Sequence, residues 1–155
     1  KFPISMMSLK VNQEMPLHAV DRLRQLLGGD LDQKRVLMLG VSYRPGVGDT
    51  RYSPAEVFAR ALIEGGVEVE AYDPFISDWL EMDMQLPEKL PSPMTFDAVV
   101  FTTGHDEFKG LDLVLWLDGS HPVILDTVNV VSKVRRERCR DLGMRVESIG
   151  RGARL

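Results

Sequence analysis

Apolar runs of a few residues alternate with amphipathic segments along most of the chain. Consecutive or alternating apolar residues predict strands, at residues 36–39, 67–72, 98–102, 123–125 and 144–149. Apolar residues three or four positions apart predict helices, at residues 16–27, 54–64, 111–117 and 131–142. Strands that alternate with helices indicate a parallel sheet. The pattern predicts an α/β fold: a doubly wound, mainly parallel sheet with helices on both faces, preceded by a linker helix.

Three of the predicted helices show an apolar face. In chain order these faces are Leu17, Val20, Leu23 and Leu27; Val57, Phe58, Ala61 and Leu62; and the side formed by Val131, Val134 and Leu142, which also carries Arg138. Residues 75–95 are rich in proline and acids, and predict a loop with a short irregular helix near Asp78–Met82.

The start of the helix at residue 54 is marked by its capping chemistry. Ser53 can accept from the first backbone N–H groups, and Pro54 fits the first helical position. Glu56 is expected to reach back to the cap with its side chain.

A charged loop of about a dozen residues separates this helix from the strand at 36–39, which is longer than most strand-to-helix connections. In parallel sheets, loops at the carboxyl ends of strands bind ligands. A dinucleotide fingerprint, G-x-G-x-x-G, is not present, because Gly40 is followed by Ser42 and Pro45.

Two arginines in this loop offer another way to hold an anion. Guanidinium groups bind phosphate through a fork of donors, so Arg44 and Arg51 could hold a diphosphate without the glycines. The alternative is that both arginines pair with Asp49 and only order the loop. The spacing does not decide between these two interpretations.

Composition narrows the class of protein. A chain of 155 residues with 44% hydrophobic residues is expected to form one domain with a substantial core. The net charge of −4 argues against nucleic acid or anionic membranes as main partners. No apolar run approaches the length of a membrane span, and the first nine residues lack the core of a secretory signal. A single cysteine fits a reducing compartment, so we expect a cytoplasmic protein.

Three other places offer candidate chemistry. Asp73 follows the second strand, where an acid can hold a ribose, but Asp73-Pro74 is also a good turn, and we favour the turn. His105, with two acids after it, suggests a metal site, but adjacent helical residues do not face one point, and a helix start is favoured. Cys139 lies among arginines that could activate a thiol, yet an ordinary half-buried cysteine is favoured.

The segment from Gly40 to Pro54 resembles the signature that opens the C-terminal domain of the UDP-glucose/GDP-mannose dehydrogenase family. The family usually reads Gly-Leu-x-[Tyr/Phe]-Lys-x-x-x-x-Asp-Thr-Arg-Glu-Ser-Pro, and the Asp-Thr-Arg-x-Ser-Pro part is quite specific. Further similar stretches follow in the same order, so that the resemblance covers nearly the whole chain: Val11-Asn12 with Met15-Pro16, Tyr72-Asp73-Pro74, Thr103 to Phe108, Asp126 with Asn129, and Ile149-Gly150-Arg151.

The resemblance implies a Rossmann-like domain and a domain organisation. Residues 1–30 would be the end of an inter-domain helix that packs across a homodimer, together with its linker. Residues 31–155 would be the nucleotide-sugar-binding domain. The helix could instead pack on its own domain, which needs no partner.

The resemblance also implies an activity for the longer enzyme. The family oxidises a sugar 6-hydroxyl to a carboxylate in two NAD-dependent steps, through a thiohemiacetal on a catalytic cysteine. Neither that cysteine motif nor a dinucleotide fingerprint occurs here. We therefore expect the C-terminal domain of an NAD-dependent nucleotide-sugar 6-dehydrogenase, excised or naturally truncated and inactive alone. Its NAD would be bound mainly by an upstream domain, and no catalytic or metal residue is assigned.

Matched to the family motif, Tyr43 and Arg44 would contact the substrate, a UDP-sugar or possibly a GDP-sugar. Arg51 would reach toward NAD. Two residues depart from the pattern: Arg44 replaces the usual lysine, and Val128 stands where many members have arginine. Losing that cation would weaken diphosphate binding or alter the choice of sugar. An alternative is a non-enzymatic, degenerate Rossmann-like module that serves assembly or regulation.

Overall fold

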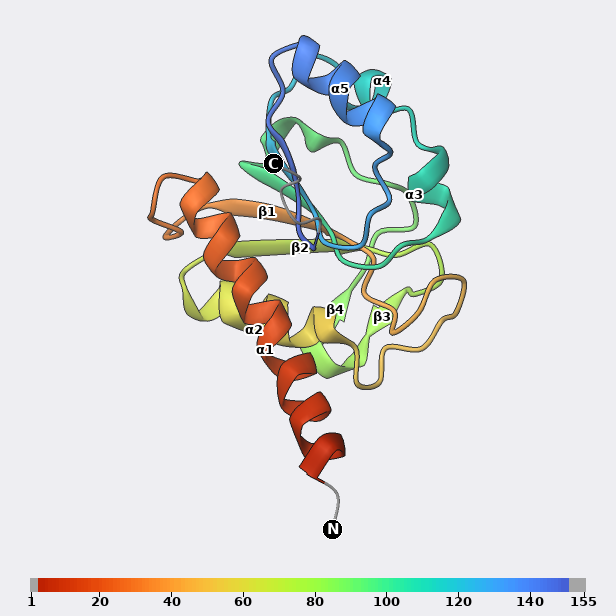
Figure 1. The fold of residues 1–155 in the computed structure, drawn as a ribbon. Coiled ribbons are helices and arrows are strands. Elements are labelled where there is room, and N and C mark those ends of the chain that lie inside the picture. The colour runs from red at the N-terminus through yellow and green to blue at the C-terminus, as the bar shows by residue number, and fades with distance from the viewer. Residues whose placement is uncertain (1–2, 151–155) are drawn as a thin grey trace.

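A five-stranded parallel sheet forms the centre of the molecule, and helices cover both of its faces (Figure 1). The computed structural model describes residues 3–150. In spatial order the strands are β2 (Glu68–Tyr72), β1 (Arg35–Leu39), β5 (Ala98–Phe101), β6 (Val123–Asp126) and β7 (Val146–Ser148). The helices are α1 (Pro3–Leu26), α2 (Pro54–Glu64), α3 (Asp106–Gly110), α4 (Leu113–Leu117) and α5 (Lys133–Asp141). The predicted α/β class, parallel sheet and leading helix are confirmed.

The buried strand β1 shows how the sequence pattern produces the two layers. Val36 and Met38 join one apolar cluster, which includes residues of α1 and α2. Leu37 and Leu39 point to the opposite face and join a second cluster, with residues of α3, α4 and α5. Alternate residues of a strand face opposite sides, so a strand covered on both faces must be apolar throughout.

The first helix differs from its prediction. It begins at Pro3 and continues through Pro16, which was predicted to open the helix and instead lies inside it. The predicted face is also shifted, since Leu17 is 45% exposed while Ala19 and Leu26 are buried with Val20 and Leu23. Packing against α2 decides which side of α1 is covered. The N-terminal end of α1 projects away from the sheet in Figure 1.

The structure adds to one local prediction and corrects another. The short irregular helix predicted near Asp78–Met82 is present as a 3-10 helix, Leu80–Met82. It lies within a small hairpin that was not predicted, formed by β3 (Asp78–Trp79) and β4 (Met84–Gln85), and a second 3-10 helix is Pro93–Thr95. The face predicted for α5 is wrong, because Val134 and Leu142 are exposed and Cys139 is buried. Both depend on contacts with distant residues, which local periodicity does not contain.

The start of α2 is as predicted, except for one contact. Ser53 is the N-cap and accepts a 3.2 Å hydrogen bond from the Ala55 N–H, with Pro54 in the first turn. Glu56 does not reach back to the cap; its carboxylate accepts a 2.9 Å hydrogen bond from Arg60. Of the helices within residues 3–150, none combines the length and the apolar character needed to cross a bilayer.

The strand order creates a place for a ligand between β1 and β5. From β1 the chain crosses to β2 on one side and then to β5 on the other. The connections that follow β1 and β5 therefore lead to helices on opposite faces of the sheet, and such a switch point is where parallel sheets usually bind ligands. Gly40 lies at this point with φ +94°, and a Cβ there would be 2.4 Å from that of Thr103. Only glycine allows the two loops to approach so closely.

Candidate functional site

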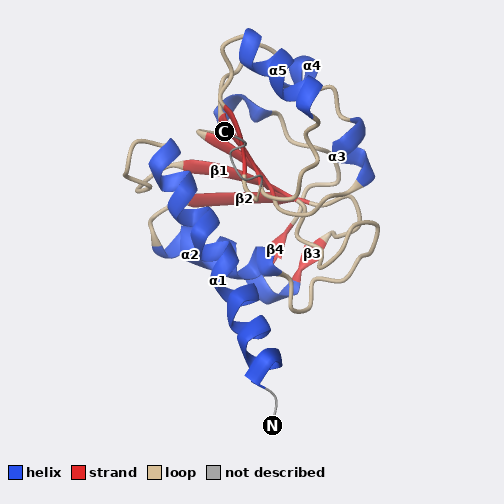
Figure 2. Cartoon of the chain, in the orientation of Figure 1, coloured by secondary structure: helices blue, strands red, loops and turns tan. Residues whose placement is uncertain are grey.

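The long loop at residues 40–53 leaves β1 at this switch point and runs beside the β3–β4 hairpin (Figure 2). The hairpin and the segment before it both contact the loop. The Thr50 hydroxyl donates to Glu81 at 2.7 Å, and a Cβ on Gly48 would lie 3.0 Å from the Phe75 carbonyl oxygen. The loop forms one side of an open hollow of about 530 Å³, which is lined by Tyr43, Arg44, Asp49, Arg51 and Tyr52.

Arg51 is held by its neighbour. Its Nε and one terminal nitrogen donate to the two carboxylate oxygens of Asp49, at 3.0 and 2.8 Å. These hydrogen bonds lower the pKa of Asp49 to about 2. The self-pairing interpretation of the loop is therefore correct for Arg51. The pair is exposed to solvent, so breaking it to reach another group would cost little.

Arg44 is different. Its side chain is exposed on the wall of the hollow, and it makes no hydrogen bond or ion pair with any residue between 3 and 150. A guanidinium with five free donors can bind two oxygens of one phosphate group. The loop therefore presents one committed arginine and one that is available to an anion.

Two exposed aromatic rings line the same hollow. Tyr43 is 54% exposed and Tyr52 is 92% exposed. Tyr52 also has φ +60°, a left-handed conformation that is uncommon for a residue other than glycine and that often marks a functional site. Sequence reasoning singled out Tyr43 but missed Tyr52. The available signal was that Tyr52 replaces a glutamate of the family motif.

The base of the loop is tied to Asp73, which is buried. One oxygen, Oδ2, accepts from the N–H groups of Val41 and Ser42 and from the Ser42 hydroxyl, at 2.8, 3.0 and 2.8 Å. The other accepts from the Phe75 N–H at 2.9 Å. Burial raises the pKa of Asp73, but the hydrogen bonds, including one from His105, outweigh it and lower the pKa to about 2. This carboxylate fastens the chain's own turn and is not available to a ribose.

His105 joins this network from the loop after β5. It is fully buried. Its Nε2 lies 2.9 Å from Asp73 Oδ2, and its Nδ1 lies 3.1 Å from the backbone nitrogen of Gly46. No group of three metal-ligating side chains occurs within residues 3–150, and His105 precedes α3 as predicted.

Of five polar side chains in the loops at the carboxyl edge of the sheet, four take part in the site and one does not. Arg44 and Arg51 line the hollow, and Asp73 and His105 contact each other beneath it. Asp126 is turned into its own loop, where its carboxylate accepts from three backbone N–H groups, those of Val128, Val130 and Val131.

Comparison with known proteins decides the family. The model of the UDP-glucose/GDP-mannose dehydrogenase family, UDP binding domain, matches residues 37–133. The chain belongs to the UDP-glucose/GDP-mannose dehydrogenase family. The match begins inside β1 and includes the whole loop at 40–53, so the hollow lies within the family's UDP binding domain.

Relatives of known function agree. The chain is 31% identical over 147 residues to a UDP-N-acetyl-D-mannosamine dehydrogenase of Methanocaldococcus jannaschii. This match covers 92% of this chain and 33% of that protein. It is 29% identical over 154 residues to a UDP-glucose 6-dehydrogenase of Rickettsia conorii, with 92% and 34% covered. The chain thus spans about a third of the length of the curated relatives that it matches.

Solved structures support the same fold. A UDP-D-ManNAc dehydrogenase of Pyrococcus horikoshii superposes with a TM-score of 0.75 at 26% identity, over 98% of this chain and 34% of that one. An NDP-N-acetyl-D-galactosaminuronic acid dehydrogenase of Methanosarcina mazei superposes with a TM-score of 0.82 over 97% of this chain and 33% of that one. At 24% identity, the second likeness concerns the fold alone.

Val128, one of the two departures from the family pattern, lies close to the loop. It is 36% exposed. If a Cβ is built on Gly104, the Cβ of Val128 and the Cγ of Pro45 both lie within 4 Å of it. An arginine at this position would start beside the 40–53 loop.

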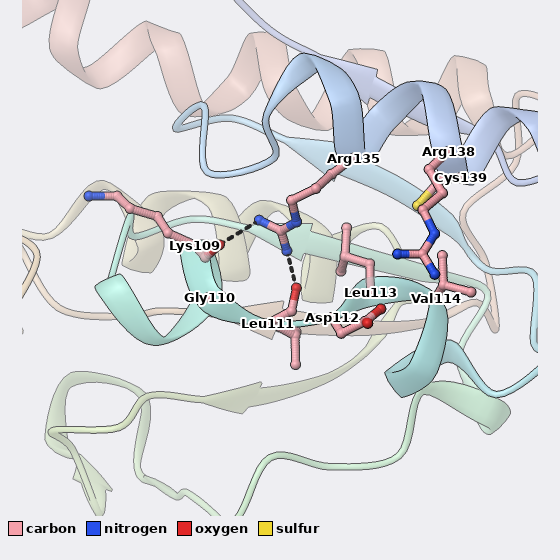
Figure 3. A pocket seen from close by; sticks show the side chains of 9 residues that line it. All are labelled: Lys109, Gly110, Leu111, Asp112, Leu113, Val114, Arg135, Arg138 and Cys139. Carbon is pink, nitrogen blue, oxygen red and sulfur yellow. Dashed lines mark hydrogen bonds between the residues drawn. The ribbon is translucent and has the colours of Figure 1, made fainter.

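Cys139 lies in a separate cavity of about 230 Å³ between α3, α4 and α5 (Figure 3). It is fully buried, not half-buried as predicted, and burial raises the pKa of its thiol. The charges of Arg135 and Arg138 lower this pKa, but burial outweighs them. The guanidinium of Arg135 also has a structural role, because it donates to four backbone carbonyls, those of Phe108, Lys109, Leu111 and Val130. A buried thiol with a raised pKa is a poor nucleophile, which favours the structural interpretation.

Proposed function

We propose that the hollow of the 40–53 loop binds the diphosphate of a nucleotide sugar, in an NAD-dependent dehydrogenase that oxidises the sugar 6-hydroxyl to a carboxylate. Tyr43 and Arg44 contact the nucleotide sugar, which is a UDP-sugar in the first place and a GDP-sugar in the second. The observation that carries the proposal is the exposed, unpaired guanidinium of Arg44 on the wall of a hollow within the family's UDP binding domain.

Charge and shape both support an anionic ligand with a ring. Arg51 and Asp49 neutralise each other, so the positive charge of Arg44 gives the lining of the hollow a net cationic character. Arginine forms bidentate, charge-assisted hydrogen bonds with phosphate. Tyr43 and Tyr52 add exposed aromatic faces, which suit stacking on a planar base. A nucleoside diphosphate combines these two features in one molecule.

NAD is bound mainly by a different part of the enzyme in this proposal. The residues after β1 do not fit the usual dinucleotide site: the glycine fingerprint is missing, and the carboxylate of Asp73 is committed to the backbone of the loop. NAD supplies the hydride acceptor of the family's oxidation. The contribution of this chain is Arg51, which can leave Asp49 at small cost and reach toward the cofactor across the domain interface.

Calorimetric titration of the 155-residue chain with UDP, GDP and NAD tests the proposal. We expect one of the two diphosphates to bind, with Arg44→Ala weakening it about tenfold or more, since a charge-assisted hydrogen bond contributes about 2 kcal/mol. Arg138→Ala removes an exposed arginine of α5, far along the chain from the loop, and is the matched control. Arg44→Ala binding as tightly as wild type would disprove the site.

The non-enzymatic alternative rests on Val128 and has its own test. If the site still binds a diphosphate although valine stands at position 128, Val128→Arg should strengthen that binding, because the new cation would be attached beside the loop. If the domain is a degenerate module, neither diphosphate binds to the wild type or to this variant, even when the chain is joined to the cofactor domain of a relative. NADH production from a UDP-sugar by that joined protein would exclude the alternative, whereas the 155-residue chain alone should produce none.

A further inference from the structure

The segment that carries Tyr43 and Arg44 is held at both of its ends. At the first end, Asp73 accepts hydrogen bonds from the N–H groups of Val41 and Ser42. At the second end, the N–H of Gly46 donates to His105 Nδ1 at 3.1 Å. His105 and Asp73 are themselves bonded to each other at 2.9 Å, so one buried pair fastens both ends.

These contacts define which ring nitrogen of His105 carries the proton. A backbone N–H can only donate, so Nδ1 must be an unprotonated acceptor. Asp73 Oδ2 is a carboxylate acceptor, so Nε2 must carry the hydrogen and donate. His105 is therefore a neutral imidazole of the Nε2–H form. A doubly protonated ring would place a second donor against the Gly46 N–H and could not hold it.

We propose that His105 is a positioning residue for the nucleotide loop: its neutral ring anchors Gly46 and thereby sets the position of Arg44, and protonation of the ring releases the loop. The inference rests on the proposed function of the 40–53 loop. It predicts that affinity for a nucleoside diphosphate depends on the protonation of a group that does not touch the ligand.

The groups around the His105 ring determine which of its two hydrogen bonds protonation breaks. From the segment after β2, it faces the anionic Asp73, together with the ring of Phe75 at 5.1 Å between centroids. From α3 it faces Phe108, at 5.6 Å. The acids that follow His105 are engaged elsewhere, Asp106 with Lys109 and Glu107 with the Tyr72 hydroxyl.

The charged residue of the loop nearest to Gly46 in the sequence is Arg44, whose side chain lies on the exposed wall of the hollow. Because Asp73 stays anionic at neutral and mildly acidic pH, its bond to the ring survives protonation. Only the Gly46 end of the segment is then released.

Two variants separate the contacts of the ring. His105→Asn keeps an acceptor at the place of Nδ1 and cannot be protonated. His105→Gln keeps a donor at the place of Nε2 and offers Gly46 no acceptor at Nδ1. Titration with UDP at about pH 8 should show His105→Asn binding about fivefold more tightly than His105→Gln, the effect of one ordinary hydrogen bond. Equal affinities would overturn the proposal.

The pH dependence provides the second comparison. Between about pH 8 and about pH 5.5, wild-type affinity for UDP should fall about fivefold more than that of His105→Asn, because only the wild-type ring can be protonated. The β-phosphate of UDP also takes up a proton in this range, and His105→Asn supplies that background. Parallel profiles would overturn the proposal. If the wild type binds GDP and not UDP, the same comparisons are made with GDP. Absence of binding of both diphosphates to the wild type at about pH 8 would instead contradict the proposed function.

A measurement without ligand or variants judges the anchor directly. Nitrogen NMR of the wild-type ring should show an unprotonated Nδ1 and a protonated Nε2 at about pH 8. On acidification, the amide proton of Gly46 should shift with the same midpoint as the His105 ring. A proton on Nδ1 at the start, a Gly46 amide that does not follow the ring, or a ring that stays neutral until the chain unfolds would each overturn the proposal.

Discussion

Replacing Asp73 by asparagine should destabilise the protein in a way that depends on pH. The carboxylate is 3% exposed and accepts five hydrogen bonds, from Val41, Ser42 (two), Phe75 and His105. They hold its pKa at about 2 instead of 3.8. At about 1.4 kcal/mol per pKa unit, this difference corresponds to roughly 2 kcal/mol of folding stability.

The sign follows from the lowered pKa. An unfolded aspartate takes up its proton near the ordinary value, before the native one does, so the contribution is complete above about pH 5 and is lost as pH falls toward about 2. Asp73→Asn has no charge to lose. It should therefore be less stable than wild type by about 2 to 3 kcal/mol at neutral pH, with a difference that shrinks on acidification.

Urea unfolding followed by circular dichroism, at several values from about pH 7 to about pH 3, measures this difference. Asp141→Asn removes the same charge from an exposed position in α5 and should change stability by about 0.5 kcal/mol or less. A constant gap between Asp73→Asn and wild type across the range would refute the reasoning, because it would show that the charge of Asp73 does not carry the effect.

Three further outcomes are expected. Gly40→Ala combines a left-handed backbone with a steric clash, and should lower the free energy of unfolding in urea by about 3 kcal/mol or more. Gly119→Ala is the control: it has φ +79° but no atom within 4 Å of the new Cβ, and it should lower this free energy by about 1 kcal/mol. Arg135→Met should lower the free energy of unfolding by about 2 kcal/mol in the same assay, because four backbone carbonyls lose a charged donor. Arg138→Met, in the wall of the same cavity, is the control and should lower it by about 0.5 kcal/mol or less. Cys139 should be alkylated rapidly in urea and hardly at all in the native protein at neutral pH, since burial raises its pKa; fast labelling of folded protein would contradict its burial.

The sequence by itself determined the features that depend on neighbouring residues. Apolar runs marked the central strands, and Ser53 with Pro54 marked the start of α2. The long loop with Arg44 and Arg51, and the family to which it belongs, followed from a contiguous motif. Each of these signals is local, so a pattern of residue types is enough to detect it.

The tertiary structure decided which of these residues are available and what holds them. Asp73 and His105 are 32 positions apart, and only the fold brings them together beneath the loop. Both arginines looked equivalent in the sequence, yet Arg51 is paired with Asp49 and Arg44 is not paired within the described residues.

Helix faces followed the same rule. Packing against other helices, and not the periodicity of α1 and α5, set which of their side chains are buried. The physical reason is common to all of these cases. Burial and partner choice are properties of contacts between distant segments, and a sequence pattern records only one side of each contact.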